Sequence, residues 1–221
     1  MHHLPAEVTL NVDKPLYFAV ANASKHAVEG LRILPGGLAV ESTWSLALDP
    51  KEGEVRLAQH AANEHVPSIG RVLGDRRVLF KYLNQHLLAV ATASASSVRI
   101  RLVDSVSGNV LYARHHSHAS GPVNVVVSEN WVVYSYVNTN EDYTEMVALE
   151  LFENGTPDLR LDEANFSSFD KFVPHVLAQS YIVPSGITAM GVTQTLKGIT
   201  RRLVICNVFL VLQLFNMPIS S

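Results

Sequence analysis

The amino-acid sequence predicts an all-β fold of stacked antiparallel four-stranded blades, as in a partial β-propeller. Its clearest element is a hairpin over residues 121–137, where two valine-rich apolar runs flank the polar turn Ser128-Glu129-Asn130. Short strand patterns separated by turn residues follow one another along the chain, and no long amphipathic helix pattern interrupts them. An Asp-x-x-x-Gly pattern also recurs at a spacing typical of propeller blades.

The predicted strands are short apolar or alternating runs bounded by residues that favour turns. In chain order they cover residues 17–21, 31–34, 43–48, 55–58, 78–82, 87–92, 98–103, 110–114, 123–127, 131–137, 146–152 and 179–182. Turn chemistry separates them at 35–37, 49–50, 107–108, 154–155 and 184–186. The polar connection 164–172 is predicted to be a loop.

The second arm of the hairpin is apolar on both faces. Side chains alternate along a strand, so one face carries Trp131, Val133 and Val137, and the other carries Val132, Tyr134 and Tyr136. Such a strand suits a position buried on both sides better than the wall of an exposed sheet. We therefore expect a central strand that pairs with residues 123–127 and buries Trp131 heavily.

A faint internal repeat supports blades. Asp49 with Gly53, and Asp104 with Gly108, each lie between two predicted strands, and Asn154-Gly155 is a weaker echo. The Asp side chain is expected to bond the turn backbone, and the Gly to adopt φ > 0. Separations of roughly 45–55 residues suit one blade for each repeat. The alternative is that Asp and Gly simply recur in β-turns.

The composition is that of a folded protein without a strongly charged partner. Hydrophobic residues make up 48% of the 221 residues and charged residues 17%, which excludes a disordered chain. The formal net charge of -3 gives no electrostatic reason to expect nucleic acid or an anionic membrane surface as partner. The single cysteine, Cys206, excludes an internal disulfide framework. Residues 1–7 lack the regions of a signal peptide.

No motif places a catalytic, cofactor-binding or metal-binding residue, so we predict a protein that is not an enzyme and needs no cofactor. His115, His116 and His118 have ligand-rich spacing, but they are expected in a polar loop with no cysteine to complete a zinc site. Segment 70–77 has two Gly and three Arg without a phosphate-loop pattern, so a charged turn is predicted. The residues singled out for a structural role are Gly121, Pro122, Trp131, Tyr134, Asp104 and Gly108.

Three asparagines stand in glycosylation sequons. They are Asn22, Asn154 and Asn165, and the last two lie in predicted loops that would accommodate a glycan. About two sequons are expected by chance in such a chain, so three give mild support for a lumenal setting.

A series of segments over residues 41–201 resembles subunit 1 of the endoplasmic reticulum (ER) membrane protein complex, in the C-terminal part of its lumenal region. The matching segments are Asn63-Glu64-His65-Val66, Gly70-Arg71-Val72-Leu73-Gly74-Asp75-Arg76, Lys81-Tyr82-Leu83-Asn84, Gly121-Pro122-Val123, residues 128–134, Gln179-Ser180-Tyr181 and Lys197-Gly198-Ile199-Thr200. The resemblance implies a quinoprotein-like β-propeller. It also implies a non-catalytic lumenal scaffold at the ER membrane, with the other subunits of a complex that inserts transmembrane proteins as partners.

The expected departures from this family lie at the ends of the chain. Residues 1–202 are predicted to be an incomplete propeller segment, and residues 203–221 an apolar tail that departs from the family pattern. The apolar run 203–215 is shorter than the roughly 20 residues needed to span a bilayer, so no transmembrane helix is expected in this chain.

Two other functions stay open at this point. The first is a free-standing β-sandwich or propeller module for protein interaction, which would also give short strands at regular spacing. The second is a fragment of a quinone-dependent dehydrogenase, since such propellers hold a quinone cofactor. That function would need acidic and Trp side chains that converge at the propeller axis.

Overall fold

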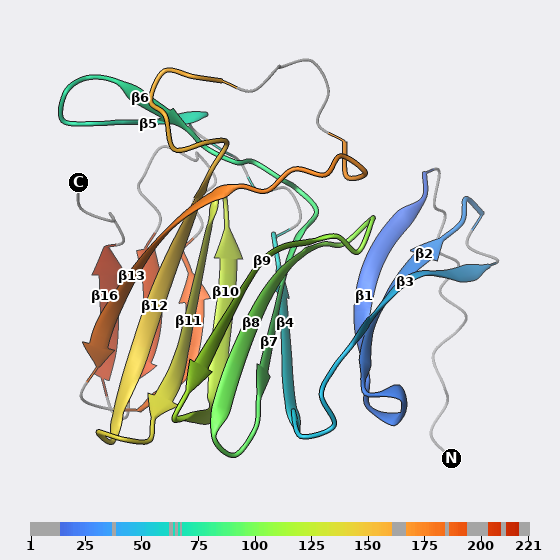
Figure 1. The fold of residues 1–221 in the computed structure, drawn as a ribbon, viewed down its shortest axis with the longest axis horizontal. Coiled ribbons are helices and arrows are strands. Elements are labelled where there is room, and N and C mark those ends of the chain that lie inside the picture. Colours follow the sequence, from blue (N-terminus) through green and yellow to red (C-terminus); the bar gives the residue numbers. More distant parts are fainter. Residues whose placement is uncertain are drawn as a thin grey trace, which may run out of the picture.

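The computed structural model describes residues 14–36, 39–61, 64, 66, 68–160, 167–183, 186–193, 203–208 and 211–216. This part of the chain is all-β, with a single 3-10 turn at Ala23–Lys25. Four of its five antiparallel sheets follow one another across the molecule in chain order, from blue to red in Figure 1, and the fifth is the two-stranded β5–β6 hairpin. The fold class is therefore the predicted one, a propeller-type arrangement of antiparallel blades.

Each sheet is built from strands that are consecutive or nearly so in the sequence. The first sheet contains β1 (Leu16–Asn22), β2 (Ala27–Ile33) and β3 (Val40–Ala47). The second contains β4 (Glu54–Gln59), β7 (Leu87–Ala93), β8 (Ser97–Asp104) and β9 (Val110–Ser117). The third contains β10 (Ala119–Ser128), β11 (Trp131–Asn138), β12 (Tyr143–Phe152) and β13 (His175–Val183). The fourth contains β14 (Ile187–Val192), β15 (Leu203–Val208) and β16 (Val211–Asn216).

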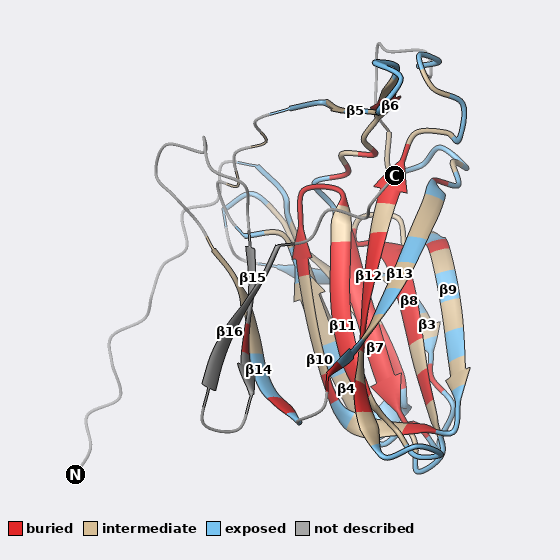
Figure 2. Cartoon of the chain, turned by 90° about the vertical axis from the view of Figure 1, so that its left-hand side faces the viewer, coloured by how far each residue is buried: buried red, intermediate tan, exposed pale blue. Residues whose placement is uncertain are grey.

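Three apolar layers join the four sheets face to face. Val28 of the first sheet packs with Leu88 and Val90 of the second. The opposite face of the second sheet, with Ile100 and Leu102, packs against the third sheet in the largest layer. A third layer joins the other face of the third sheet to the fourth, and buries Met146 and Cys206. Figure 2 shows the buried residues concentrated in the two middle sheets, which are covered on both faces.

Successive side chains of a strand point to opposite faces of the sheet, and this alternation explains the two-sided burial. In β7, Leu88 and Val90 point toward the first sheet, whereas Leu87, Ala89 and Ala91 point toward the third. In β11 the predicted division is confirmed, because Val132, Tyr134 and Tyr136 face the second sheet and Val133 faces the fourth. The strand pairs with β10 as expected. Trp131 packs against the layer between the third and fourth sheets but is half-buried at the end of the strand, so it is less buried than predicted.

The Asp-x-x-x-Gly segments do not occupy equivalent places in the blades. Residues 49–53 connect β3 to β4 and so pass from one sheet to the next, whereas residues 104–108 connect β8 to β9 within the second sheet. Only Gly108 has the expected positive φ, at 77°. The similarity reflects shared turn chemistry, and the spacing of these two segments is not the length of one blade.

Several strands were not predicted, and one predicted loop is a strand. β5 (Gly70–Val72), β14 and β16 were missed because their residues have weak or interrupted strand patterns, and they form by pairing with distant or adjacent segments. His115 and His116 lie in β9, because the strand continues through them. The predicted division at residue 202 falls between β14 and β15 of one sheet, and it stays a prediction.

A hairpin insertion, residues 68–82, leaves the second sheet between β4 and β7 and reaches the third sheet. Its strands β5 and β6 (Val78–Phe80) lie above the third sheet in Figure 1. Backbone bonds run from Tyr82 N–H to the Leu151 carbonyl (3.0 Å) and from Glu153 N–H to the Phe80 carbonyl (2.9 Å). Arg71 also pairs with Glu150 at 2.7 Å. The insertion therefore ties two neighbouring sheets together by polar contacts outside their apolar layer.

Candidate functional site

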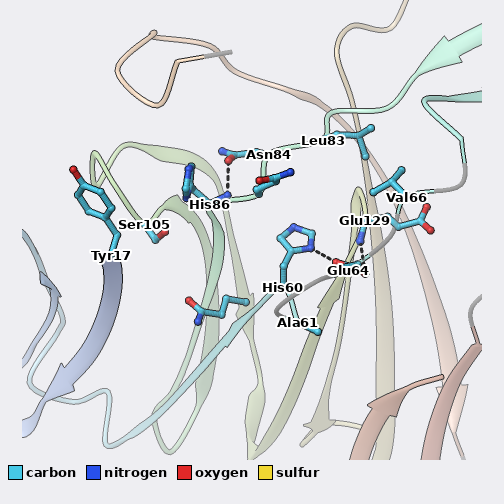
Figure 3. Close-up of a pocket in the computed structure, with 12 residues that line it drawn as sticks. Tyr17, His60, Ala61, Glu64, Val66, Leu83, Asn84, His86, Ser105 and Glu129 are labelled. Carbon is cyan, nitrogen blue, oxygen red and sulfur yellow. Dashed lines mark hydrogen bonds and ion pairs between the residues drawn. The ribbon is translucent and has the colours of Figure 1, made fainter. Parts of the chain in front are cut away.

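A polar pocket of about 590 Å³ opens where the ends of the first three sheets meet. Tyr17 of β1 and Ser105 after β8 line one side, and residues 59–61 lie below them. Loop residues Asn84 and His86, and Glu129 from the β10–β11 turn, complete the wall (Figure 3). Sequence reasoning missed this pocket, because its walls come from loops far apart in the chain.

The carboxylate of Glu64 organises one side of the pocket. It contacts His60, accepts a hydrogen bond from the Ser128 hydroxyl, and accepts another from the Glu129 N–H at 3.1 Å. Lys81 pairs with the Glu129 carboxylate at 2.8 Å, and both side chains are largely buried. Figure 3 shows His60, Glu64 and Glu129 close together on this side of the pocket. Glu64 therefore holds the β10–β11 turn against the segment that follows β4, and Lys81 holds the same turn against the hairpin insertion.

Asp104 and Gly108 shape a turn that receives side chains from two directions. The Asp104 carboxylate accepts bonds from the backbone of Val106 (2.9 Å) and Ser107 (3.0 Å), as the sequence predicts, and from the Asn84 amide (2.9 Å). The Trp44 indole N–H donates to the Ser105 carbonyl at 2.9 Å. The β8–β9 turn of the second sheet thus binds Trp44 of the first sheet.

The three histidines singled out in the sequence do not converge. His115 and His118 are exposed, whereas the partly buried His116 ring lies between two tyrosine hydroxyls. Its Nε2 is 2.8 Å from the Tyr134 hydroxyl and its Nδ1 is 2.9 Å from the Tyr136 hydroxyl. Burial lowers the pKa of His116 to about 4, helped by the nearby positive charge of Arg114. His116 is a neutral bridge between the second and third sheets.

Gly121 and Pro122 lie at an irregular point of β10, where the register with β11 shifts between Ser120 and Asn124. A Cβ atom on Gly121 would lie 2.1 Å from a carboxylate oxygen of Glu54 in the second sheet. The other Glu54 oxygen accepts from the Val123 N–H at 3.3 Å. The missing side chain at Gly121 therefore lets two sheets approach closely at this point.

The sequon asparagines that the structure describes both bond to neighbouring groups. Asn22 caps the 3-10 turn by accepting from the Lys25 N–H at 3.2 Å. The Asn154 amide donates to the Leu159 carbonyl at 2.7 Å and accepts from the Thr156 N–H at 2.7 Å. Asn165 lies outside the described residues.

Segment 70–77 is a strand and a turn, in which Arg77 forms a local pair and Arg71 a distant one. Arg77 bonds Asp75 at 2.6 Å and keeps the pKa of that carboxyl below its usual value. Burial raises the pKa of Glu150, and the Arg71 charge partly offsets the effect. Within the described ranges, no three His, Cys, Asp or Glu side chains gather as a metal site would require. No helix among those ranges is long and apolar enough to cross a membrane.

Comparison with known proteins gives a consistent result. A family model described as the second β-propeller of ER membrane protein complex subunit 1 matches residues 1–214, a match that runs past residue 202. The chain is 41% identical over 195 residues to that subunit from Xenopus laevis, which covers 85% of this chain and 19% of the relative. It is 42% identical over 196 residues to the subunit from Gallus gallus, and this match covers 85% of this chain and 19% of the relative. It is 35% identical over 185 residues to the subunit from Schizosaccharomyces pombe, and this match covers 81% of this chain and 21% of the relative. The chain spans about a fifth of the length of these curated relatives.

Proposed function

The chain belongs to the family of ER membrane protein complex subunit 1, second β-propeller, and we propose that it acts there as a non-catalytic lumenal scaffold. In this role it supports the insertion of transmembrane proteins by holding other subunits of the complex in place. The observation that carries the proposal is the use made of its polar side chains. At the pocket, Glu64 binds the β10–β11 turn of the third sheet, and Lys81 of the hairpin insertion pairs with Glu129 of the same turn.

The alternatives need arrangements that differ from the observed one. A β-sandwich module packs two sheets face to face, whereas this chain packs four in series through three apolar layers. A quinone-dependent site needs tryptophans that converge. Trp44 packs between the first and second sheets, and Trp131 packs between the third and fourth. The scaffold is therefore the function that the geometry supports best.

The test uses the whole protein in cells, with substitutions at three kinds of position. Val132→Asp places a carboxylate in the fully buried layer between the second and third sheets. We expect the abundance of the protein and of the assembled complex to fall several-fold together, because unfolded protein is degraded. His115→Ala, on the exposed side of β9, is the control and should change neither quantity.

A third variant separates scaffolding from chemistry. His60→Ala alters the pocket that a catalytic function would use. If insertion activity is lost while the complex assembles at its normal level, the scaffold proposal is wrong and the pocket performs chemistry. Parallel loss of assembly and activity, or no loss of either, agrees with a scaffold.

A further inference from the structure

The third sheet ends in an unusually unprotected edge strand. β13 pairs with β12 on one side, and no other described strand lies on its opposite side. All nine residues pair in one unbroken register, from Phe152 with His175 to Thr144 with Val183. Between His175 and Val183 the strand contains no Asp, Glu, Lys, Arg or Pro. It is a long, regular and uncharged edge.

Two of the other outer strands, β3 and β9, show the usual defences of a sheet edge, whereas the shorter β16 is uncharged like β13. β3 contains Glu41, and its register with β2 shifts between Gly30 and Leu31. β9 contains Arg114, and its register with β8 shifts between Leu102 and Val103. Charges and bulges of this kind discourage the addition of another strand. Their absence from β13 distinguishes this edge from the two matched edges of the same protein.

The register identifies the backbone groups that face outward. Leu151 of β12 donates its N–H to the Asn130 carbonyl at 2.7 Å, so its backbone points toward β11. The alternate residues of β12 then point toward β13, where they pair with residues 177, 179, 181 and 183. The N–H and C=O groups of Val176, Ala178, Ser180 and Ile182 are left on the open side. Their spacing matches that of the backbone groups along another extended strand.

The side chains beside this edge indicate what kind of segment would fit. Ile182 is 66% exposed, and Ala178 and Ser180 lie exposed on the same face. On the other face Leu177 and Tyr181 are only half-buried. An added strand would sit beside apolar or neutral groups on both faces, so charged residues in it would lose solvation without gaining a partner.

We propose that the outer edge of β13 binds an extended, uncharged segment of another subunit of the complex, which adds to the third sheet as a fifth strand. The proposal rests on the scaffold function above and gives it a mechanism, since main-chain hydrogen bonds supply affinity and alternate side chains supply specificity.

The experiment places a benzophenone photocrosslinker at Ile182 in the assembled complex, and a matched one at Ala113 on the exposed face of β9. Mass spectrometry of the crosslinked peptide identifies the neighbour. We expect the Ile182 probe to join one uncharged segment of another subunit, and the Ala113 probe to give at least tenfold less of that product. No crosslink from Ile182, or a crosslink to a second copy of this chain, would overturn the proposal.

Two substitutions test the added strand directly. Ser180→Pro removes an outward N–H without breaking a bond to β12, and Ile182→Lys introduces the charge that the edge lacks. For these variants the probe is placed at Ala178 instead. Each should reduce the crosslink from Ala178 about tenfold or more, while Ala113→Lys should leave it unchanged. An unchanged crosslink in both edge variants contradicts the proposal.

Hydrogen exchange in the unmodified complex gives a measurement that does not depend on variants. An added strand should protect all the amides of residues 176–183, whereas a free edge leaves every second amide to exchange rapidly. Rapid exchange in a complex that retains all its subunits would overturn this proposal alone. Failure of the other subunits to co-purify with the unmodified chain would instead overturn the scaffold function.

Discussion

At the scale of single residues, His116 shows how a polar group can join two sheets. Its ring is held by the hydroxyls of Tyr134 and Tyr136, which belong to the next sheet. His116→Ala removes both hydrogen bonds, and the buried Tyr134 hydroxyl loses this partner while the Tyr136 hydroxyl keeps Glu145. We expect the free energy of unfolding to fall by about 1–3 kcal/mol. The measurement is urea denaturation of the purified chain.

His115→Ala is the matched control, because the neighbouring side chain is exposed on the other face of β9. Its effect should be within about 0.5 kcal/mol. Equal effects of the two substitutions would show that the bridge contributes nothing. All three histidines were expected in a polar loop, but His116 lies in β9 and faces the layer.

The free energy of unfolding should depend on pH through the protonation of His116. His116 has a pKa of about 4 when folded, against an ordinary value of 6.5. Between these values the unfolded chain binds the proton and the folded chain does not, so stability falls as pH drops from 6.5 to 4. After a discount for partial exposure, the loss should be about 2 kcal/mol. Denaturation at several pH values should show a smaller loss in His116→Ala, and an identical loss would contradict the assignment.

At the scale of elements, the β8–β9 turn depends on the absence of a side chain at Gly108. Its φ of 77° is unfavourable for other residues, and an added Cβ would lie 2.6 Å from Cγ of Trp44. Gly108→Ala should therefore lower the free energy of unfolding by about 2–4 kcal/mol. The control is Gly74→Ala in the β5–β6 turn, where no atom lies within 4 Å of the new Cβ.

Thermal unfolding of both variants provides the measurement. The Gly74→Ala protein should unfold at the wild-type temperature or slightly above it, because the substitution restricts the unfolded chain. If the Gly108→Ala protein unfolded at the same temperature as the Gly74→Ala protein, Trp44 would have to move aside without a loss of stability, and the prediction would be wrong.

The elements also show why the sequence predicts some features and not others. β7 and β11 were predicted because apolar residues run through nearly the whole strand on both faces, so the local pattern and the final two-sided burial agree. β5 has three residues, among them Gly70 and Arg71, and exists because it pairs with β6 and docks on the third sheet. The pocket had no local signal either. Its Glu64 meets Ser128 and Glu129 only after two sheets have packed.

At the scale of the whole molecule, shared apolar layers should make neighbouring sheets unfold together. Leu102 is fully buried in the layer between the second and third sheets. Leu102→Ala should cost about 2–5 kcal/mol and speed hydrogen exchange in both of these sheets. Val28→Ala, in the layer between the first and second sheets, should affect the first sheet and spare the fourth. If Leu102→Ala speeds hydrogen exchange in the second sheet but not in the third, the two sheets do not unfold together and the prediction is wrong.

The hairpin insertion imposes an order on the making of the protein. Arg71 must wait for Glu150, which lies 79 residues further along the chain. At about 5–20 residues per second, a ribosome needs about 4–16 seconds to supply that partner. During this interval the hairpin can form its own turn but has no surface on which to rest. The insertion carried by the second sheet therefore cannot dock until the third sheet has been translated, and a chaperone that holds the nascent chain has this interval in which to act.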